Sequence, residues 1–187
     1  MQITLTQQSR GLVINKAVSV LEKGGIIVYP SDTVYGLAVD ATNDAAIERL
    51  TDLKGRRPDQ KFSYNFSDFS MVEKFVDLKE DQKQIIKKYL PGPLTFIVSG
   101  EVSVRIPENS IITDLTRAFG KPTTATSANL TGMPPIISIK SLDAKLYLNS
   151  DLIIEDIEFA GAKPSTIVDI SEKPYKVIRE GDVPFQG

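Results

Sequence analysis

Hydroxyl and amide side chains recur in this sequence where apolar segments begin or end. Ser31 and Thr33 follow one apolar run, Ser127 and Asn129 follow another, and Ser165 opens a third. These groups donate and accept hydrogen bonds without carrying a net charge. In mixed α/β sheets, ligands bind at the ends of strands. The positions therefore predict that these side chains bind and orient a polar ligand.

Cationic side chains occupy the same kind of position. Lys54 and Arg56 belong to a KGRR run that follows a predicted helix, Arg105 closes one predicted strand and Arg179 ends another. Arginine binds carboxylates and phosphates through paired hydrogen bonds. Together with the hydroxyl groups, and without a nucleophile–base pair, these cations indicate an anionic ligand that carries phosphate, carboxylate or both.

Each cluster also has a purely structural interpretation. Ser31 and Thr33 can satisfy the backbone of a turn, and the KGRR run can complement the dipole of a helix C-terminus. Asn129 can end a helix in the left-handed conformation. Arg105 and Arg179 can belong to surface ion pairs. These alternatives stay open for each cluster alone, whereas the clusters taken together favour a binding site.

The composition excludes several kinds of chemistry. The 187 residues include no histidine and no cysteine, which excludes a Ser-His-Asp triad, a histidine-ligated zinc ion, a thiolate metal site and a disulfide. Neither G-x-x-x-x-G-K-[ST] nor G-x-G-x-x-G occurs, so a nucleotide has to be held without either motif. The net charge of −2 provides no overall positive field for nucleic acid.

The same totals predict one domain. A content of 41% hydrophobic and 25% charged residues is ordinary for a globular protein. No linker, repeat or low-complexity stretch divides the chain, so residues 1–187 are expected to form a single domain. The polar N-terminal segment and the lack of a long apolar run predict neither a signal peptide nor a membrane span, and a cytoplasmic location is expected.

Apolar periodicity predicts the elements that position these clusters. The strands and helices are interleaved without strict alternation, which favours an α/β fold with a mixed sheet flanked by helices. We expect strands over 2–5, 26–29, 62–66, 94–98, 102–106, 123–126, 152–154, 166–170 and 176–179, and helices over 11–23, 44–53 (capped by Asp44), 71–75, 82–89, 111–119 and 141–148.

The segment YPSDTVYG at 29–36 places small polar residues inside a long apolar stretch. We expect Pro30 and Gly36 to turn the chain sharply out of a buried strand. The turn would then present hydroxyl groups and backbone amides to a small ligand, and the flanking apolar residues would hold it against the core.

Several short motifs occur in one order along the chain: YPSDTVYGL, LKGRRPDQKFS, YLPGPLTFIV, SVRIPENSI, ATSANLTG, KPSTIVDI and VIREG. In this order and near this spacing they resemble the YrdC-like family of threonylcarbamoyl-AMP synthases, from about residue 10 to residue 181. The resemblance implies one α/β domain with a twisted mixed sheet and a concave, positively charged cleft.

The resemblance also implies an activity. Such synthases combine L-threonine, bicarbonate and ATP into threonylcarbamoyl-AMP and pyrophosphate, usually with Mg²⁺. A partner enzyme then transfers the threonylcarbamoyl group to the adenosine beside the anticodon of tRNA, and double-stranded RNA binding is also ascribed to the family. Because the substrates supply both nucleophile and electrophile, the protein has only to position them and neutralise charge.

The matching motifs imply roles for individual residues and no metal ligands. The implied catalytic residues are Lys54 and Arg56. The implied threonine-binding residues are Ser31, Thr33, Arg105, Ser127 and Ser165, and the implied nucleotide-binding residues are Lys54, Arg56, Gln60, Asn129 and Arg179.

The sequence departs from the commoner family pattern after KGR. Gln60, Lys61 and Asn65 stand in a region where many synthases have a KPL or NPL triplet and then a histidine. Ser31 stands where many members have threonine, and Glu101 where a hydroxyl group is common. This pattern is closer to the YciO-like branch, whose amino-acid substrate need not be threonine.

Two alternative functions remain open. The basic clusters at 54–61 and 83–88 suit a YciO-like RNA-binding or ribosome-associated module without synthase activity. A third hypothesis is a hydrolase or transferase acting on a threonylcarbamoyl or nucleotide product, with Asp32 or Asp169 as base or Mg²⁺ ligand.

Overall fold

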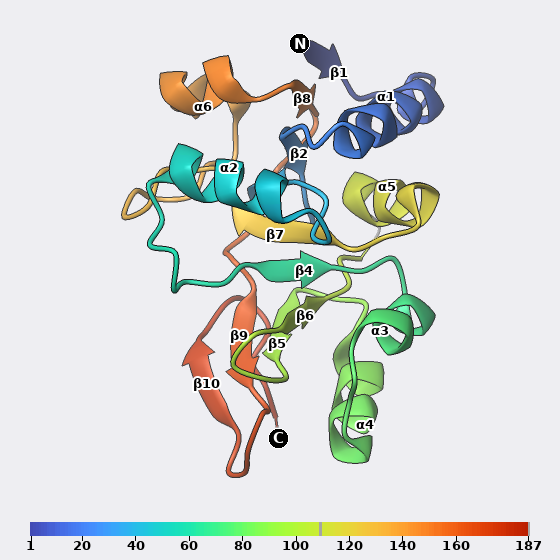
Figure 1. The fold of residues 1–187 in the computed structure, drawn as a ribbon, viewed down its shortest axis with the longest axis vertical. Helices are drawn as coiled ribbons and strands as arrows, with labels where there is room; N and C mark the ends of the chain where they lie inside the picture. Colours follow the sequence, from blue (N-terminus) through green and yellow to red (C-terminus); the bar gives the residue numbers. More distant parts are fainter. Residues whose placement is uncertain (109, 187) are drawn as a thin grey trace.

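The strands form one mixed sheet along the long axis of the molecule, from β1 at one end to β10 at the other (Figure 1). The computed structural model describes residues 1–108 and 110–186. Neighbouring strands follow the order β1-β8-β2-β3-β7-β4-β6-β5-β9-β10. The pairs β1–β8, β2–β8, β4–β6 and β5–β9 are parallel, and the other pairs are antiparallel. The strands are β1 (Gln2–Thr4), β2 (Ile27–Pro30), β3 (Tyr35–Ala38), β4 (Ser63–Asn65), β5 (Leu94–Ile97), β6 (Ser103–Arg105), β7 (Thr123–Ser127), β8 (Leu152–Glu155), β9 (Thr166–Asp169) and β10 (Lys176–Arg179).

Helices cover both faces of this sheet. They are α1 (Arg10–Glu22), α2 (Asp44–Lys54), α3 (Phe69–Phe75), α4 (Glu80–Tyr89), α5 (Ile111–Phe119) and α6 (Ala144–Asn149), with a short 3₁₀ helix at Ile139–Ser141. The predicted mixed sheet flanked by helices is confirmed. Each predicted strand and helix is present, with ends that differ by three residues or fewer. None of the helices within residues 1–108 and 110–186 is long and apolar enough to cross a membrane.

Successive side chains of β2 point to opposite faces of the sheet, and their contacts show which helices cover the same face. Ile27 packs with α1 and α5, whereas the next residue, Val28, packs with α2 and α6. A third apolar cluster holds α3 and α4 against β5 and β6. Tyr64 packs against this cluster and against the α2–α6 cluster, so α2, α3, α4 and α6 cover one face of the sheet. On the opposite face, α1 and α5 pack over β2 and β8.

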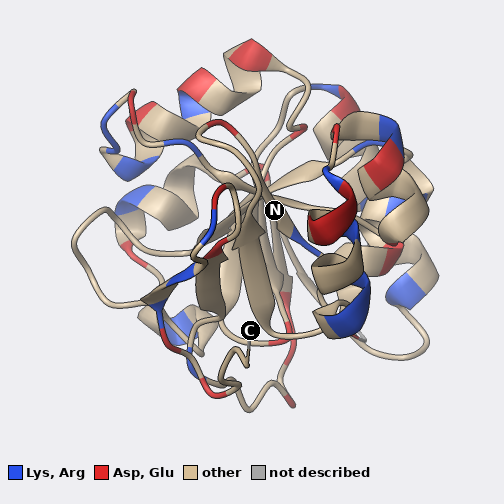
Figure 2. Ribbon diagram, turned by 90° about the horizontal axis from the view of Figure 1, so that it is seen from below, with Lys and Arg blue, Asp and Glu red and all other residues tan. Residues whose placement is uncertain are grey.

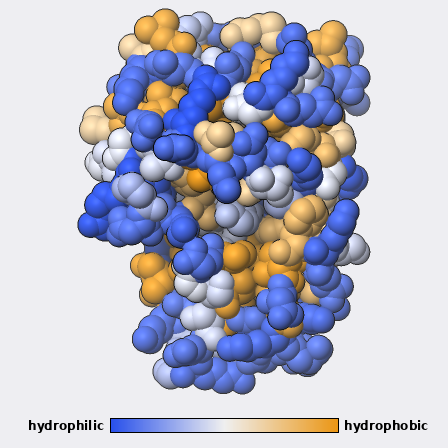
Figure 3. All heavy atoms as spheres, viewed as in Figure 1, coloured by the Kyte–Doolittle hydropathy of each residue, from blue (hydrophilic) through white to orange (hydrophobic). Residues whose placement is uncertain are grey.

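Polar residues lie mainly at the surface, and apolar residues lie mainly in these buried clusters. Lysine, arginine, aspartate and glutamate lie mainly on helices and loops around a largely uncharged sheet (Figure 2). The face seen in Figure 3 is mostly hydrophilic, with apolar atoms showing in small groups between polar ones. The hydrophobic effect therefore holds the helices to the sheet, because their apolar sides are removed from water there.

The ends of the helices follow from local hydrogen bonding. The Oδ1 atom of Asn43 accepts a hydrogen bond from the amide of Ala46 at 3.1 Å, so Asn43 caps α2 and the predicted cap, Asp44, is instead its first residue. Asparagine is a strong N-cap because its side chain satisfies an amide that has no helical partner. Gly55 and Gly120 end α2 and α5 with φ of 62° and 76°, a conformation that favours glycine.

The YPSDTVYG segment forms a hairpin whose second strand, β3, the sequence analysis did not predict. Pro30 is the last residue of β2, and the turn consists of residues 31–34. Gly36 lies within β3 opposite Tyr29, and a Cβ atom at Gly36 would lie 2.5 Å from Cζ of Tyr29. The chain does turn out of the buried strand directly after Pro30, but the predicted turning role of Gly36 is wrong, because Gly36 lies within β3 and makes room for the tyrosine ring.

Strand register brings polar side chains from distant segments to the face that carries α1 and α5. Residues directly opposite one another in neighbouring strands point to the same face. This rule connects strands that are far apart in sequence, from β2 to β10. The opposed pairs are Tyr29–Gly36, Gly36–Ser127, Ser63–Ala125, Asn65–Thr123, Asn65–Arg105, Thr95–Ile167 and Ile167–Arg179.

Candidate functional site

A cavity of about 240 Å³ lies on this face, where the register places those side chains. Among the described residues that line it, Arg56, Arg105 and Arg179 are cationic and no carboxylate is present. The hydroxyl groups of Ser31, Thr33, Ser63, Thr95, Ser127 and Ser165 also belong to its lining. The cavity therefore combines positive charge with neutral hydrogen-bonding groups, as an anionic polar ligand requires.

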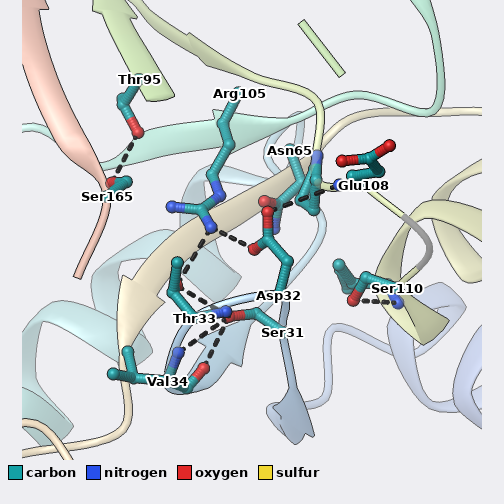
Figure 4. Close-up of polar contacts among 12 residues, drawn as sticks. Ser31, Asp32, Thr33, Val34, Asn65, Thr95, Arg105, Glu108, Ser110 and Ser165 are labelled. Atoms are coloured by element: carbon teal, nitrogen blue, oxygen red, sulfur yellow. Dashed lines mark hydrogen bonds and ion pairs between the residues drawn. The ribbon is translucent and has the colours of Figure 1, made fainter. Parts of the chain in front are cut away.

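Arg105 is fixed in the cavity wall by the hairpin turn. Its Nη2 atom donates to Oδ1 of Asp32 and, at 3.1 Å, to the hydroxyl group of Thr33 (Figure 4). The side chains of Arg105 and Asp32 are only 9% and 11% exposed. Asp32 thus forms a buried ion pair with Arg105. The Nε and Nη1 atoms of Arg105 bond to no other described residue, which leaves them available to a ligand.

Ser31 organises the turn that carries Asp32 and Thr33. Its hydroxyl oxygen accepts from the amides of Thr33 and Val34 at 3.1 and 3.2 Å, and it donates to the carbonyl of Val34 at 2.6 Å (Figure 4). The structural alternative for Ser31 is therefore correct. Since Ser31 also lines the cavity, the same hydroxyl group shapes the turn and forms part of the cavity surface.

Arg179 is also fixed in the cavity lining. Its Nε and Nη2 atoms donate to the carbonyl of Ser165 at 3.0 and 2.8 Å. The hydroxyl groups of Ser165 and Thr95 are 3.0 Å apart. Burial, and then the nearby charge of Arg105, lower the pKa of Arg179. The two guanidinium groups therefore repel each other across the cavity, and an anion between them would relieve that repulsion.

Arg56 reaches the cavity from the segment after α2. Its Nε and Nη2 atoms donate to the carbonyls of Gln60 and Lys61 at 2.9 and 2.6 Å. Its guanidinium group lies 4.6 Å from the centre of the Phe62 ring, a favourable cation–π contact. Burial lowers the pKa of Arg56. These contacts hold a partly desolvated positive charge beside the cavity.

Lys54, Gln60 and Asn129 are not among the described residues that line the cavity. Lys54 is 4% exposed, and its ammonium group donates to the carbonyls of Ser127 and Asn129 at 2.5 and 2.6 Å. Burial, and then the charge of Arg56, lower the pKa of Lys54 to about 7. Lys54 thus fixes the loop after β7, while Gln60 offers its carbonyl to Arg56.

The side chain of Asn129 bonds to the same loop. Its amide nitrogen donates to the carbonyls of Leu130 and Met133 at 3.0 and 2.6 Å. Asn129 follows β7, so the alternative that it ends a helix is wrong. The predicted site residues that the cavity does bring together are Ser31, Thr33, Arg56, Arg105, Ser127, Ser165 and Arg179.

The sequence analysis missed several lining residues, among them Tyr29, Ser63 and Thr95. Ser63 and Thr95 are polar residues within short strands, each next to an apolar or aromatic neighbour that points to the other face. That alternation was a usable signal. Tyr29 gave no comparable signal, because a tyrosine in an apolar strand is equally suited to a core.

The RNA-binding alternative, which rests on the basic clusters at 54–61 and 83–88, receives less support from the structure. Within the two basic clusters, Arg57, Lys61 and Lys83 form exposed ion pairs with Asp59, Glu101 and Glu73 at 3.6, 3.1 and 3.3 Å, which reduces the net positive charge.

The carboxylates of the third hypothesis are also engaged. Asp169 accepts from the amide and hydroxyl group of Ser171 at 2.9 and 2.6 Å, bonds that lower its pKa. Asp32 is bound to Arg105. In the described part of the chain, no group of three or more aspartate, glutamate, histidine or cysteine residues is placed to hold a metal ion.

The fold and the cavity together define an α/β protein with a small arginine-lined cavity. A family model described as "Sua5_yciO_yrdC: Telomere recombination" matches residues 19–181. The chain therefore belongs to the Sua5/YciO/YrdC family, and the resemblance proposed from the motifs is confirmed.

Individual relatives agree with this assignment. A protein named threonylcarbamoyl-AMP synthase from Xanthomonas euvesicatoria is 33% identical over 174 residues, which cover 84% of this chain and 93% of that protein. The structure of Escherichia coli YciO matches with a TM-score of 0.85 and 28% identity, over 97% of this chain and 95% of that one. Pyrococcus abyssi Sua5, solved in complex with L-threonine, matches with a TM-score of 0.85 and 27% identity, over 98% of this chain but only 58% of that one.

Proposed function

We propose that this protein is an L-threonylcarbamoyladenylate synthase, which condenses L-threonine, bicarbonate and ATP to threonylcarbamoyl-AMP and pyrophosphate. The observation that carries the proposal is the lining of the cavity. Three arginines held by hydrogen bonds and several hydroxyl groups line it, and none of its described lining residues is a carboxylate. Relatives named threonylcarbamoyl-AMP synthase and the L-threonine complex of Sua5 support it.

The size of the cavity supports separate positions for the amino acid and the nucleotide in this proposal. At about 240 Å³ it lies just below the range of roughly 300–1,000 Å³ that is usual for small-molecule pockets. The amino acid would therefore occupy the cavity, with its carboxylate on the free nitrogen atoms of Arg105 and its polar groups near Ser31, Thr33, Ser127 and Ser165. The nucleotide would extend from the cavity past Arg56 and Arg179.

The residues outside the lining fit this arrangement in two ways. Gln60 and Asn129 are half-buried on the loops that follow α2 and β7, where a nucleotide leaving the cavity would pass. Lys54 acts through the loop that it holds, since its ammonium group binds the carbonyls of Ser127 and Asn129. On this proposal Lys54 positions Ser127, and Arg56 is the direct phosphate ligand.

The reaction needs little proton transfer from the protein. A carbamate oxygen on the amino acid attacks the α-phosphorus of ATP, and the bond from that phosphorus to the pyrophosphate oxygen breaks. Arg56 and Arg179 would stabilise the negative charge that develops on the phosphate oxygens, and Arg105 would orient the nucleophile. These roles, which are positioning and charge stabilisation, suit a cavity lined by fixed guanidinium groups and by hydroxyl groups.

Magnesium enters this proposal only as part of the MgATP substrate. The described residues do not fit a resident magnesium site, because Asp32, which lies between the lining residues Ser31 and Thr33 in the sequence, is engaged by Arg105, and no acidic cluster is present among them. Transfer of the product to tRNA by a partner enzyme, direct binding of tRNA or double-stranded RNA, and a cytoplasmic location belong to the same proposal.

The direct test is product formation from labelled bicarbonate, L-threonine, ATP and Mg²⁺, detected by chromatography and mass spectrometry. We expect threonylcarbamoyl-AMP from the wild type, little from Arg56→Ala and normal amounts from Arg57→Ala. Arg57 is the matched control, since it neighbours Arg56 in sequence but its side chain is 73% exposed. The absence of any carbamoyl-adenylate, with threonine or with other small amino acids, would contradict the proposal; RNA binding in its place would favour the module without synthase activity.

A further inference from the structure

Tyr29 and Asn65 form a buried polar pair at the base of the cavity. Tyr29 is 3% exposed and belongs to the cavity lining, and Asn65 is completely buried. The Nδ2 atom of Asn65 lies 3.0 Å from the hydroxyl oxygen of Tyr29 and 3.1 Å from the carbonyl oxygen of Thr124. Neither residue was assigned a role by the sequence motifs.

The carbonyl of Thr124 fixes the direction of these hydrogen bonds. A carbonyl only accepts, so the amide group of Asn65 has to turn its nitrogen atom toward Thr124 and Tyr29. That nitrogen carries two hydrogen atoms, and Tyr29 receives one of them. Asn65 Oδ1 lies away from this pair and has no partner among the described residues.

The hydroxyl group of Tyr29 is therefore an acceptor from Asn65 and still has its own proton to donate. No described residue accepts that proton. A buried O–H group without an acceptor costs free energy, and the cavity is the open space that Tyr29 adjoins. This proton is therefore available for a hydrogen bond to a ligand that occupies the cavity.

Gly36 shows where the hydroxyl group lies. A Cβ atom at Gly36 would be 2.7 Å from the hydroxyl oxygen of Tyr29, so this oxygen sits directly over the glycine. Gly36 lines the cavity and pairs with Ser127, another lining residue. The pKa of Tyr29 is raised to about 12, chiefly by burial, and Arg105 and Asp32 are the charges that act on it. The hydroxyl group is thus protonated at physiological pH and lies near the guanidinium group of Arg105.

The geometry points to Tyr29 as a substrate-binding residue, whose hydroxyl group donates a hydrogen bond to the carboxylate of the amino acid held by Arg105. This inference rests on the proposed function, because it takes an α-amino acid to be the occupant of the cavity. Asn65 is the positioning residue, since its amide hydrogen atom directs the tyrosine proton into the cavity.

The test is calorimetric binding of L-threonine and of threoninol, which lacks the carboxylate, to the wild type and to Tyr29→Phe. Loss of a hydrogen bond to a charged group predicts about 10- to 100-fold weaker binding of L-threonine. The effect on threoninol should be several-fold smaller, because its carboxylate is missing. Equal losses for both ligands, or no loss for L-threonine, would overturn the inference.

Tyr35→Phe is the matched control. Tyr35 is also buried in the hairpin, but its hydroxyl group bonds to the backbone of Asp156 and it is not among the described lining residues. This variant should bind L-threonine as the wild type does. Binding of ATP alone should be unchanged in Tyr29→Phe, which shows that the variant is folded.

The design separates this inference from the proposed function. If the wild type binds no α-amino acid in a panel that includes glycine, serine and threonine, the proposed function fails and the assignment of Tyr29 fails with it. If the wild type binds one of them and Tyr29→Phe binds it equally well, only the assignment of Tyr29 fails.

Discussion

The ion pair between Asp32 and Arg105 makes the strongest prediction about how the structure around the cavity is stabilised. Asp32→Asn keeps the shape of the side chain and removes its charge. With side chains only 9% and 11% exposed, the substitution leaves a guanidinium group buried without its counter-charge. Breaking such a buried pair costs roughly 3–5 kcal/mol. For a chain of this size, about 3 kcal/mol corresponds to a decrease in Tm of roughly 6–12 °C.

The assay is thermal unfolding of wild type and Asp32→Asn, each with increasing sodium phosphate. A phosphate ion that binds in the cavity supplies the negative charge that Asp32→Asn has lost beside Arg105. Phosphate should therefore raise the Tm of the variant more than that of the wild type. Asp114→Asn is the control, because Asp114 pairs with Arg10 and Arg117 at the surface, with its side chain 38% exposed. There the expected loss is below about 1 kcal/mol. Equal stability of wild type and Asp32→Asn would refute the reasoning.

Three further predictions follow from individual contacts. Arg56→Ala should weaken ATP binding by one to two orders of magnitude, with Arg57→Ala unchanged, because a charge-assisted phosphate contact is lost; unchanged affinity in a calorimetric titration would show that Arg56 is misassigned. Gly36→Ala should lower the free energy of unfolding in urea by about 1–3 kcal/mol, since the added methyl group overlaps the Tyr29 ring; wild-type stability would mean that the ring moves freely. The pKa of Lys54 is 10.5 in the unfolded chain and about 7 in the folded protein. Between pH 7 and 10.5 the Lys54 amine is therefore protonated in the unfolded chain and mostly neutral in the folded protein. The free energy of unfolding should rise with pH across this window, by at most about 1.4 kcal/mol per pH unit. Denaturant titrations of wild type and Lys54→Met should show this slope in the wild type alone, and parallel curves would exclude the lowered pKa.

The sequence was sufficient to predict most elements because their local signals are strong. Apolar spacing and a following glycine located α5, and the β-branched run before Pro30 located β2. β3 was missed because Tyr35–Ala38 is buried on both sides, so it lacks the alternation that identifies a half-exposed strand. The cap of α2 was displaced by one residue, since Asn43 and Asp44 are both good caps and only the hydrogen bond to Ala46 decides between them.

Pairing between distant strands is the part of the fold that no local pattern reveals. β4 lies between β6 and β7, and this placement brings Asn65 beside Thr123 and Arg105. The sequence predicted a cleft with hydroxyl and guanidinium groups, yet it did not predict Tyr29 as a lining residue. Long side chains were the least predictable, because the direction of Lys54 depends on two carbonyls that lie more than seventy residues away.

The parallel pairing of β1 with β8 has a consequence for biosynthesis. Gln2 pairs with Ile153, so β1 cannot join the sheet until the ribosome has synthesised the chain through β8. Contacts of such sequence separation are associated with slow folding. The cavity likewise draws its walls from residues between Tyr29 and Arg179, and no nascent fragment that ends before Arg179 contains them all. A ligand of the cavity therefore stabilises only chains that extend past Arg179, and a threonine-like ligand should accelerate none of the earlier steps of co-translational folding.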